Sequence, residues 1–285
     1  MFLIKIWKYS RPLNLVIIIV TLLLGYFSMS SRSIQQITNH EIELLILMSV
    51  SLCCIAASGY WLNDFYDYNI DKINRSGQKH LHDEFTKNQI FLACAIINGI
   101  GLVSSWYIGI TIFFCCISNV ILLVFYSFFK RTFLMGNIIV AYLCASVLFV
   151  AYWLANDTWN TPYLDKIQFY LIFSFLISMV REIIKDLEDM EGDKIYGCTT
   201  LPLLFGLKNT KFAIWILLIT LSYFLLKYIY MASSYKLIYL LIMVWIPLII
   251  LGLSIVPAND KKDFARISKY CKIIMIAGLV GLTMN

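Results

Sequence analysis

Residues 109–129 read GITIFFCCISNVILLVFYSFF, a long run without a single charged side chain. An α-helix needs about 20 apolar residues to cross the hydrocarbon core of a bilayer, so this run is long enough to span it. We predict an all-α, polytopic membrane helix bundle with about nine transmembrane helices. The other eight predicted spans are residues 12–30, 42–62, 89–107, 134–155, 167–184, 211–231, 236–256 and 268–284.

The composition excludes several classes of protein. Of the 285 residues, 60% are hydrophobic and 14% are charged, with a mean hydropathy of +0.78. Soluble domains carry about 25% charged residues, so a soluble enzyme, a disordered chain and a disulfide-rich secreted module are excluded. The eight cysteines form no CxxC pair and no Cys/His ligand spacing, so we expect them to act as small buried hydrophobic side chains.

The positive charges predict the orientation in the membrane. The net charge is +6, but the basic residues lie between the apolar runs, which favours a role in topology over nucleic-acid binding. If the N-terminus is cytoplasmic, most of the 23 lysine and arginine residues fall in cytoplasmic segments. We therefore expect an integral membrane protein with a cytoplasmic N-terminus and an odd number of spans.

Many of the acidic residues gather in two short segments. The first contains Asn63, Asp64, Asp67 and Asp71, and the second contains Asp186, Asp189 and Asp193. The aspartates of each segment follow an i, i+3, i+7 spacing, which places them on one helix face. Like charges at this spacing repel one another, and a bound divalent cation would remove the repulsion. Oxygen ligands favour Mg²⁺, above all when phosphate oxygens complete its shell.

Both acidic segments follow even-numbered spans that run from outside to inside. We therefore expect both at the cytoplasmic ends of their helices, where they can converge on one site. The alternative is that they are solvated loop charges without a ligand. An anionic ligand near helix C-termini would need the cation and nearby basic side chains. Candidate basic residues are Lys72, Arg75, Lys79, Lys130, Arg131, Arg181, Lys185 and Lys194.

A Mg²⁺-bound diphosphate at the mouth of an apolar bundle indicates a lipid diphosphate as substrate. The metal and the basic residues would stabilise the charge that develops on the departing diphosphate. A prenyl diphosphate would then pass through a carbocation-like state, with its tail in the bundle and aromatic faces near the cation.

The two acidic segments resemble the aspartate motifs of the UbiA superfamily of intramembrane prenyltransferases. Residues 60–75, YWLNDFYDYNIDKINR, are similar to the first motif. Residues 181–194, REIIKDLEDMEGDK, with the following Gly197 and Thr200-Leu201-Pro202, are similar to the second. Lesser similarities are Arg11-Pro12-x-Asn14, Tyr126-x-x-x-Lys130-Arg131 and Gly136-Asn137. The resemblance covers nearly the whole chain.

The resemblance implies a single domain, residues 1–285, with a central cavity and a Mg²⁺-diphosphate site that faces the cytoplasm. Cap loops at about 63–88 and 185–210 are expected to cover this site. The implied metal ligands are Asn63, Asp64, Asp67, Asp71, Asp186, Asp189 and Asp193. The implied catalytic residues are Asp67, Asp71, Asp189, Asp193 and Lys130. The implied substrate-binding residues are Arg11, Asn14, Tyr126, Lys130, Arg131, Arg181 and Lys185. Of these, Arg181 and Lys185 are expected to contact either the diphosphate or the carboxylates of the motifs.

One departure from the family pattern concerns the first cap loop. Many relatives continue the first motif with a P-x-R-P turn, whereas this chain has Ser76-Gly77-Gln78-Lys79. Lys79 lies one position after the missing arginine. The conformation of this loop and the acceptor are therefore left open by the resemblance.

Residues 181–193 most resemble the family branch that makes digeranylgeranylglyceryl phosphate. In that branch geranylgeranyl diphosphate alkylates the free hydroxyl of geranylgeranylglyceryl phosphate. The alternatives are prenylation of an aromatic acceptor of the hydroxybenzoate or naphthoate type, a UbiA-type terpene cyclase and, outside enzymes, an ion-binding transporter or a scaffold. The expected partners are the two substrates and membrane lipids, with no nucleic acid and no protein partner.

Overall fold

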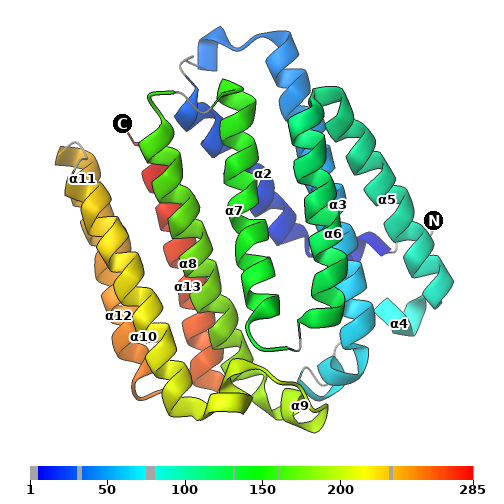
Figure 1. Cartoon of the computed structure of the whole chain (residues 1–285), viewed down its shortest axis with the longest axis vertical. Helices are drawn as coiled ribbons and strands as arrows, with labels where there is room; N and C mark the ends of the chain where they lie inside the picture. The colour runs from blue at the N-terminus through cyan, green and yellow to red at the C-terminus, as the bar shows by residue number, and fades with distance from the viewer. Residues whose placement is uncertain are drawn as a thin grey trace. The chain divides into compact units, whose positions relative to one another are not determined.

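The computed structural model describes residues 6–30, 34–74, 81–130, 132–158, 161–230 and 234–284, and these ranges contain helices but no strands (Figure 1). In this described part, eight helices are long and apolar enough to cross a membrane. They are Pro12–Met29, Asn39–Lys72, Lys87–Ile108, Ile110–Phe129, Met135–Asn156, Leu164–Glu188, Leu201–Tyr230 and Tyr235–Ile255. The predicted all-α membrane fold is confirmed.

The last predicted span, residues 268–284, lies in helix α13 (Lys261–Thr283). This helix has the length of a span, but charged residues run through its first half, from Lys261 to Lys272. It is therefore not among the eight helices that meet both criteria, and the predicted number of about nine holds only if α13 is included.

Large apolar side chains point outward along the spans. Phe114, Phe212 and Ile219 are 60%, 67% and 62% exposed, and many other Ile, Leu, Val and Phe side chains are similarly uncovered. A soluble monomer rarely shows apolar patches of this extent. Such a surface is stable against lipid tails, so the chain is an integral membrane protein.

The chain divides into two compact units, the first formed by Met1–Phe129 and Val150–Asp157. Its elements are η1 (Lys8–Ser10), α2 (Pro12–Met29), η2 (Ile34–Gln36), α3 (Asn39–Asn74), α4 (Leu81–Glu84), α5 (Lys87–Ile108), α6 (Ile110–Phe129) and the end of α7 (Met135–Asn156). Helix α3 packs against α2, α5 and α6. Thr86 and Gln89 form a capping box at the start of α5, which satisfies backbone N–H groups that a helix start leaves free.

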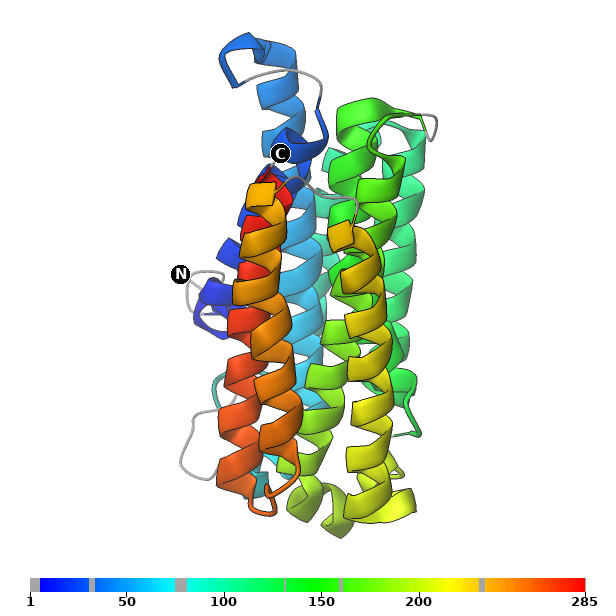
Figure 2. The same ribbon diagram turned by 90° about the vertical axis from the view of Figure 1, so that its left-hand side faces the viewer.

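The second unit consists of Lys130–Phe149 and Thr158–Asn285. It contains the first part of α7, α8 (Leu164–Glu188), α9 (Met190–Ile195), α10 (Leu201–Tyr230), α11 (Ser234–Leu240), η3 (Leu241–Trp245), α12 (Ile246–Ile255) and α13. Helix α8 packs against α10 and α13, and α12 contacts α10 and α13. The turned view shows α12, in orange, beside α13, in red (Figure 2).

Two helices of the second unit depart from regular geometry. Gly206 interrupts α10 with φ +75° and ψ +169°, a conformation that side-chain-bearing residues rarely adopt. Before α12, η3 is a π-helical turn, and Pro247 follows it by two residues. Pro247 has no N–H and would clash with the carbonyl four residues earlier in an α-helix, and the wider turn accommodates both defects.

The two expected cap loops are shorter than predicted. Residues 63–74 continue α3, residues 81–84 form α4, and α5 begins at Lys87. In the second expected loop, α8 continues to Glu188, α9 occupies 190–195, and α10 begins at Leu201. Hydropathy marks only the apolar part of a helix, whereas backbone hydrogen bonding continues through the polar turns that follow it.

Candidate active site

The first aspartate motif lies on the last turns of α3. Asn63, Asp67 and Asp71 are spaced i, i+4, i+8 on this helix and therefore share one face. Asn63 and Asp67 are half-buried, and Asp71 is buried with 8% exposure. The helix thus carries a row of side-chain oxygen atoms near its C-terminus, where the helix dipole favours a cation over an anion.

Asp64 has a partner on another element. Its Oδ1 accepts a hydrogen bond from Nη2 of Arg11 at 3.2 Å, and the Arg11 guanidinium lies 5.0 Å from the centroid of the Tyr60 ring. Arg11 has φ +52°, a left-handed conformation that costs energy for a non-glycine residue. A predicted metal ligand and a predicted substrate contact are therefore paired with each other. Asn14 follows in the first turn of α2 and is half-buried.

Helix α4 packs against the polar end of α3 through aromatic rings. The His82 ring stacks on Phe65 at 5.2 Å and on Tyr68 at 4.9 Å between centroids. The Tyr68 hydroxyl donates to Asp83 Oδ1 at 2.7 Å, and Lys72 Nζ lies 4.2 Å from the Tyr68 ring centroid. His82 therefore has a packing role beside the motif.

The segment before α2 is also attached to the motif helix and to α4. Trp61 Nε1 donates to Ser10 Oγ at 3.0 Å, and both residues are buried. Lys8 Nζ lies 2.5 Å from Glu84 Oε1, and this hydrogen bond raises the pKa of Lys8 above its usual value. These contacts of Ser10 and Lys8 fix the segment that contains Arg11, and so help to hold Arg11 beside the first motif.

The second aspartate motif spans a break between two helices. Helix α8 ends at Glu188, Asp189 has φ −97° and ψ +5°, and α9 begins at Met190. The N–H of Asp189 bonds to the carbonyl of Lys185 at 2.9 Å, and the carbonyl of Asp189 accepts from the N–H of Asp193 at 3.1 Å. The expected single helix face is therefore divided at its middle residue.

Asp186 is held in place by an asparagine from α7. Asn137 Nδ2 donates to Asp186 Oδ2 at 2.8 Å, and Asn137 is 5% exposed. Asp186 also interacts electrostatically with Asp193, Glu182 and Lys185. The second motif thus brings Asp186 and Asp193 into one negative region, with its first carboxylate fixed by a buried donor.

The turn that supplies Asn137 also fixes Lys130. A Cβ atom on Gly136 would lie 2.8 Å from Lys130 Cα, closer than real Cβ contacts allow, and 3.0 Å from the Lys130 carbonyl oxygen. The glycine therefore permits the chain to fold back on itself between α6 and α7. Lys130 is half-buried at this turn, so one short segment positions both a predicted diphosphate contact and the donor to Asp186.

Arg181 and Lys185 are paired with an acidic residue that the motif analysis left unassigned. Glu182 is buried, with 8% exposure, and its carboxylate contacts Arg181 Nη1 and, at 3.4 Å, Lys185 Nζ. The Arg181 Nε atom is buried and has no hydrogen-bond partner within the described ranges. Glu182 is not one of the motif aspartates, so contact of these two cations with the diphosphate or with the motif carboxylates stays a prediction.

The remaining predicted residues are less informative. Tyr126 lies near the end of α6 and is half-buried. Arg131 and the segment 75–80, including the departure from the family turn, lie outside the described residues. Among the described residues, no group of three His, Cys, Asp or Glu side chains is arranged to hold a metal ion on its own.

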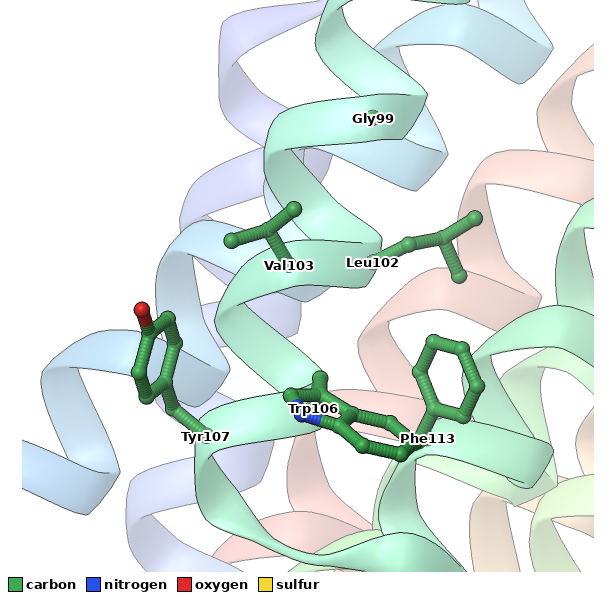
Figure 3. A pocket seen from close by; sticks show the side chains of 6 residues that line it. All are labelled: Gly99, Leu102, Val103, Trp106, Tyr107 and Phe113. Atoms are coloured by element: carbon green, nitrogen blue, oxygen red, sulfur yellow. The ribbon is translucent and has the colours of Figure 1, made fainter.

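An apolar pocket on the first unit lies far from the first motif along α5. Its volume is about 470 Å³, and its lining consists of Gly99, Leu102, Val103, Trp106, Tyr107 and Phe113 (Figure 3). Trp106 and Phe113 meet edge to face, with ring centroids 4.9 Å apart. No charged residue lines this pocket, so it cannot hold a diphosphate. Trp and Tyr at a helix end are typical of a membrane interface.

Comparison with known proteins assigns the family. Residues 17–274 match the UbiA prenyltransferase family. The chain belongs to this family. The resemblance of the two aspartate segments is thereby confirmed, and with it the prediction of a prenyltransferase.

Relatives of this UbiA chain include digeranylgeranylglyceryl phosphate synthases from methanogens. The protein of Methanosphaera stadtmanae is 31% identical over 284 residues, covering 96% of each chain. That of Methanothermobacter thermautotrophicus is 26% identical and covers 93% of this chain and 90% of its own.

Solved structures show the same fold. A structure described as concerning digeranylgeranylglyceryl phosphate synthase in membranes superimposes with a TM-score of 0.76 and 25% identity, covering 99% of this chain and 97% of its own. A UbiA homologue from Archaeoglobus fulgidus, bound to GPP and Mg²⁺, gives a TM-score of 0.68 and 16% identity, covering 98% of this chain and all of the other.

Several residues that hold this UbiA site together have no role assigned to them from the sequence. Glu182 was detectable, because it precedes Lys185 by three residues on the same helix. The contacts of Asn137, His82 and Ser10 join residues that are distant in the sequence or lie on different elements. No spacing rule identifies such pairs.

Proposed function

We propose that this UbiA chain transfers a geranylgeranyl group from its diphosphate to geranylgeranylglyceryl phosphate, in a Mg²⁺-dependent reaction within the membrane. The observation that carries the proposal is the arrangement around the second motif. Asp186 is fixed by Asn137, and two cations are fixed by Glu182 beside it. The acceptor follows from the names of the relatives, which cover most of the chain.

The donor atoms of both motifs suit Mg²⁺. They are carboxylate and amide oxygens, without sulfur or imidazole, which is the ligand set of a hard cation. Mg²⁺ is commonly held by one or two carboxylates together with substrate phosphates rather than by a complete protein cage. In the described ranges, no three His, Cys, Asp or Glu side chains are arranged to hold a metal ion by themselves. This arrangement fits a cation that binds together with the diphosphate. The residues that would hold it are Asn63, Asp67, Asp71, Asp186, Asp189 and Asp193.

When bound, Mg²⁺ supplies positive charge that stabilises the leaving diphosphate. Basic side chains of the protein would also stabilise the negative charge on the leaving diphosphate. Lys130 is fixed at its turn, and Arg181 and Lys185 are held by Glu182 at the end of α8. In the reaction the C–O bond to the diphosphate breaks, the prenyl carbon bonds to the acceptor hydroxyl oxygen, and the hydroxyl proton leaves with the diphosphate. The proposal that both motifs act on one diphosphate rests on the sequence resemblance.

The proposal includes the orientation expected from the positive charges. With a cytoplasmic N-terminus, the order of the spans predicts that both motifs lie at the cytoplasmic ends of their helices. Labelling in closed vesicles tests this. Single cysteines introduced at the exposed positions Ile195 and Asn39, in a variant without the native cysteines, should label from opposite sides.

The test of the function uses the purified full chain in detergent with geranylgeranyl diphosphate, geranylgeranylglyceryl phosphate and Mg²⁺. Mass spectrometry should detect the doubly alkylated glycerol phosphate. The product should disappear with EDTA and in Asp67→Asn and Asp189→Asn. The matched control is Glu191→Gln, an exposed acidic residue beside Asp189, which should keep the activity.

Other outcomes would revise the proposal in defined ways. If the diphosphate is consumed in the presence of Mg²⁺ without this product, the glyceryl phosphate acceptor is wrong, and aromatic acceptors and cyclisation are tested next. If folded protein consumes no prenyl diphosphate of any length, the proposed reaction is wrong.

A further inference from the structure

A second charged cluster lies at the end of the second unit that is opposite to the aspartate motif. The first turns of α8, the last turns of α10 and the first turns of α11 contribute Lys166, Phe169, Tyr170, Tyr228 and Lys236. Phe169 and Tyr228 stack with ring centroids 4.0 Å apart and planes within 3°, and Tyr170 meets Tyr228 edge to face at 5.7 Å. We call these five residues the aromatic–lysine cluster.

Lys236 is the unusual member of the cluster. It is 6% exposed, and its Nζ lies 5.1 Å from the centroid of the Tyr228 ring. Within the described ranges, no hydrogen bond or ion pair with a protein oxygen satisfies this ammonium group. Burial of a charge is costly unless the charge is paired, and a ring face satisfies none of the three N–H donors. The site therefore has donors without an acceptor.

The Tyr170 hydroxyl is a second buried donor of this kind, and Lys166 adds positive charge beside Lys236. The Tyr170 hydroxyl is buried and makes no hydrogen bond of normal geometry to a described residue. Lys166 is half-buried and interacts electrostatically with Lys236, so two like charges share the cluster. An anion with several oxygens would accept from the Lys236 ammonium group and from the phenol, and the positive charge of both lysines would attract it.

We propose that the aromatic–lysine cluster binds the phosphate group of an anionic membrane lipid. The cluster lies at the ends of membrane-spanning helices, and exposed aromatic side chains at 230 and 235 flank it. A lipid can place its phosphate among the lysines and its chains along these apolar helices, as anionic headgroups do in basic pockets between spans. Free inorganic phosphate would gain only the polar part of these contacts.

This lipid site is distinct from the proposed acceptor site. Lys166 and Asp186 lie on the same helix, twenty residues apart, which corresponds to about 30 Å at 1.5 Å per residue. An acceptor bound at the cluster could not place its hydroxyl beside the second aspartate motif. The bound lipid is therefore a structural ligand of the second unit.

The test measures lipid binding to the purified full chain by native mass spectrometry and by the thermal shift on adding phosphatidylglycerol in detergent. The wild-type protein should retain the anionic lipid through delipidation and melt at higher temperature when it is added. Lys236→Met should weaken binding at least tenfold, and Tyr170→Phe, which removes only the hydroxyl, several-fold. Lys236→Arg should keep it. The control is Lys227→Met, an exposed lysine near the same end of α10.

Three results would overturn the proposal. The first is equal lipid retention in the wild type, Lys236→Met and Tyr170→Phe. The second is an equal loss in Lys227→Met, which would indicate general surface charge. The third is full protection by inorganic phosphate alone, which would assign the cluster to a free anion. If Lys236→Met does not fold, Tyr170→Phe decides the matter.

Discussion

The hydrogen bond from Asn137 to Asp186 makes a quantitative prediction about the proposed reaction. Replacing Asn137 by Ala removes a buried donor 2.8 Å from the carboxylate. A hydrogen bond to a charged group contributes about 1.5–3 kcal/mol. Since about 1.4 kcal/mol corresponds to a factor of ten, kcat/KM should fall roughly 10- to 100-fold. Loss of such a supporting contact typically weakens metal binding by about the same factor.

The assay is steady-state prenyl transfer over a range of Mg²⁺ concentrations. Asn137→Ala should raise the Mg²⁺ concentration for half-maximal rate, whereas Asn137→Asp, which has the same shape but places a second negative charge near Asp186, should lose more activity. The control is Asn156→Ala on the same helix, because Asn156 Nδ2 donates to the carbonyls of Met29 and Tyr152, each at 3.0 Å. This control should lower stability without changing the Mg²⁺ dependence.

The reasoning is refuted if folded Asn137→Ala keeps the wild-type kcat/KM and Mg²⁺ dependence. It is also refuted if Asn156→Ala shifts the Mg²⁺ dependence as much. In either case the contact to Asp186 would contribute only to folding.

Three further predictions follow from contacts on both units. Gly136→Ala should lower the free energy of unfolding by about 1–3 kcal/mol and raise the KM for the prenyl diphosphate, because the added Cβ would lie 2.8 Å from Lys130 Cα. The control is Gly99→Ala, whose Cβ would meet nothing within 4 Å. This control should be neutral in the same thermal and kinetic assays. Glu182→Gln should lower the free energy of unfolding by about 2–4 kcal/mol, because two cations lose their shared carboxylate, and an unchanged melting temperature would contradict this. The raised pKa of Lys8 means that its bond to Glu84 stabilises the fold below pH 10.5 and is lost as the pH rises through the raised value; Lys8→Met should remove that part of the alkaline decline in melting temperature, and an unaltered decline would show that the pair contributes nothing.

The helices are predictable from the sequence because each apolar run has about the length that a membrane span requires. The run at 109–129 corresponds to α6 (Ile110–Phe129), and the run at 134–155 to α7 (Met135–Asn156). The length of α3 is underestimated, because the helix continues for twelve residues beyond the end of the predicted span at residue 62, to Asn74. The polar motif residues lack the apolar signal, although they keep the helical hydrogen bonds.

The sequence predicts candidate ligands of the site but not the contacts that support them. Spacing within a motif indicates Asp67, Asp71 and Asp189 as candidates, and their role as ligands stays a prediction. Spacing could not show that Asp64 is paired with Arg11, 53 positions away, or that Asp186 is paired with Asn137, 49 positions away. Such pairs depend on how distant elements pack, and a single sequence contains no direct measure of that packing.

The π-helical turn η3 has a consequence for the rotational phase of the last part of the second unit. The buried residues Leu240, Val244 and Leu248 recur every four positions, whereas an α-helix advances 3.6 residues per turn. The π-helical turn therefore contains one residue more than the corresponding turn of an α-helix. Deleting Met243 would convert the turn to an α-helix and rotate everything before it by about 100° relative to α12. A single-codon deletion would thus turn Lys236 away from Tyr228 while leaving the composition of the span almost unchanged.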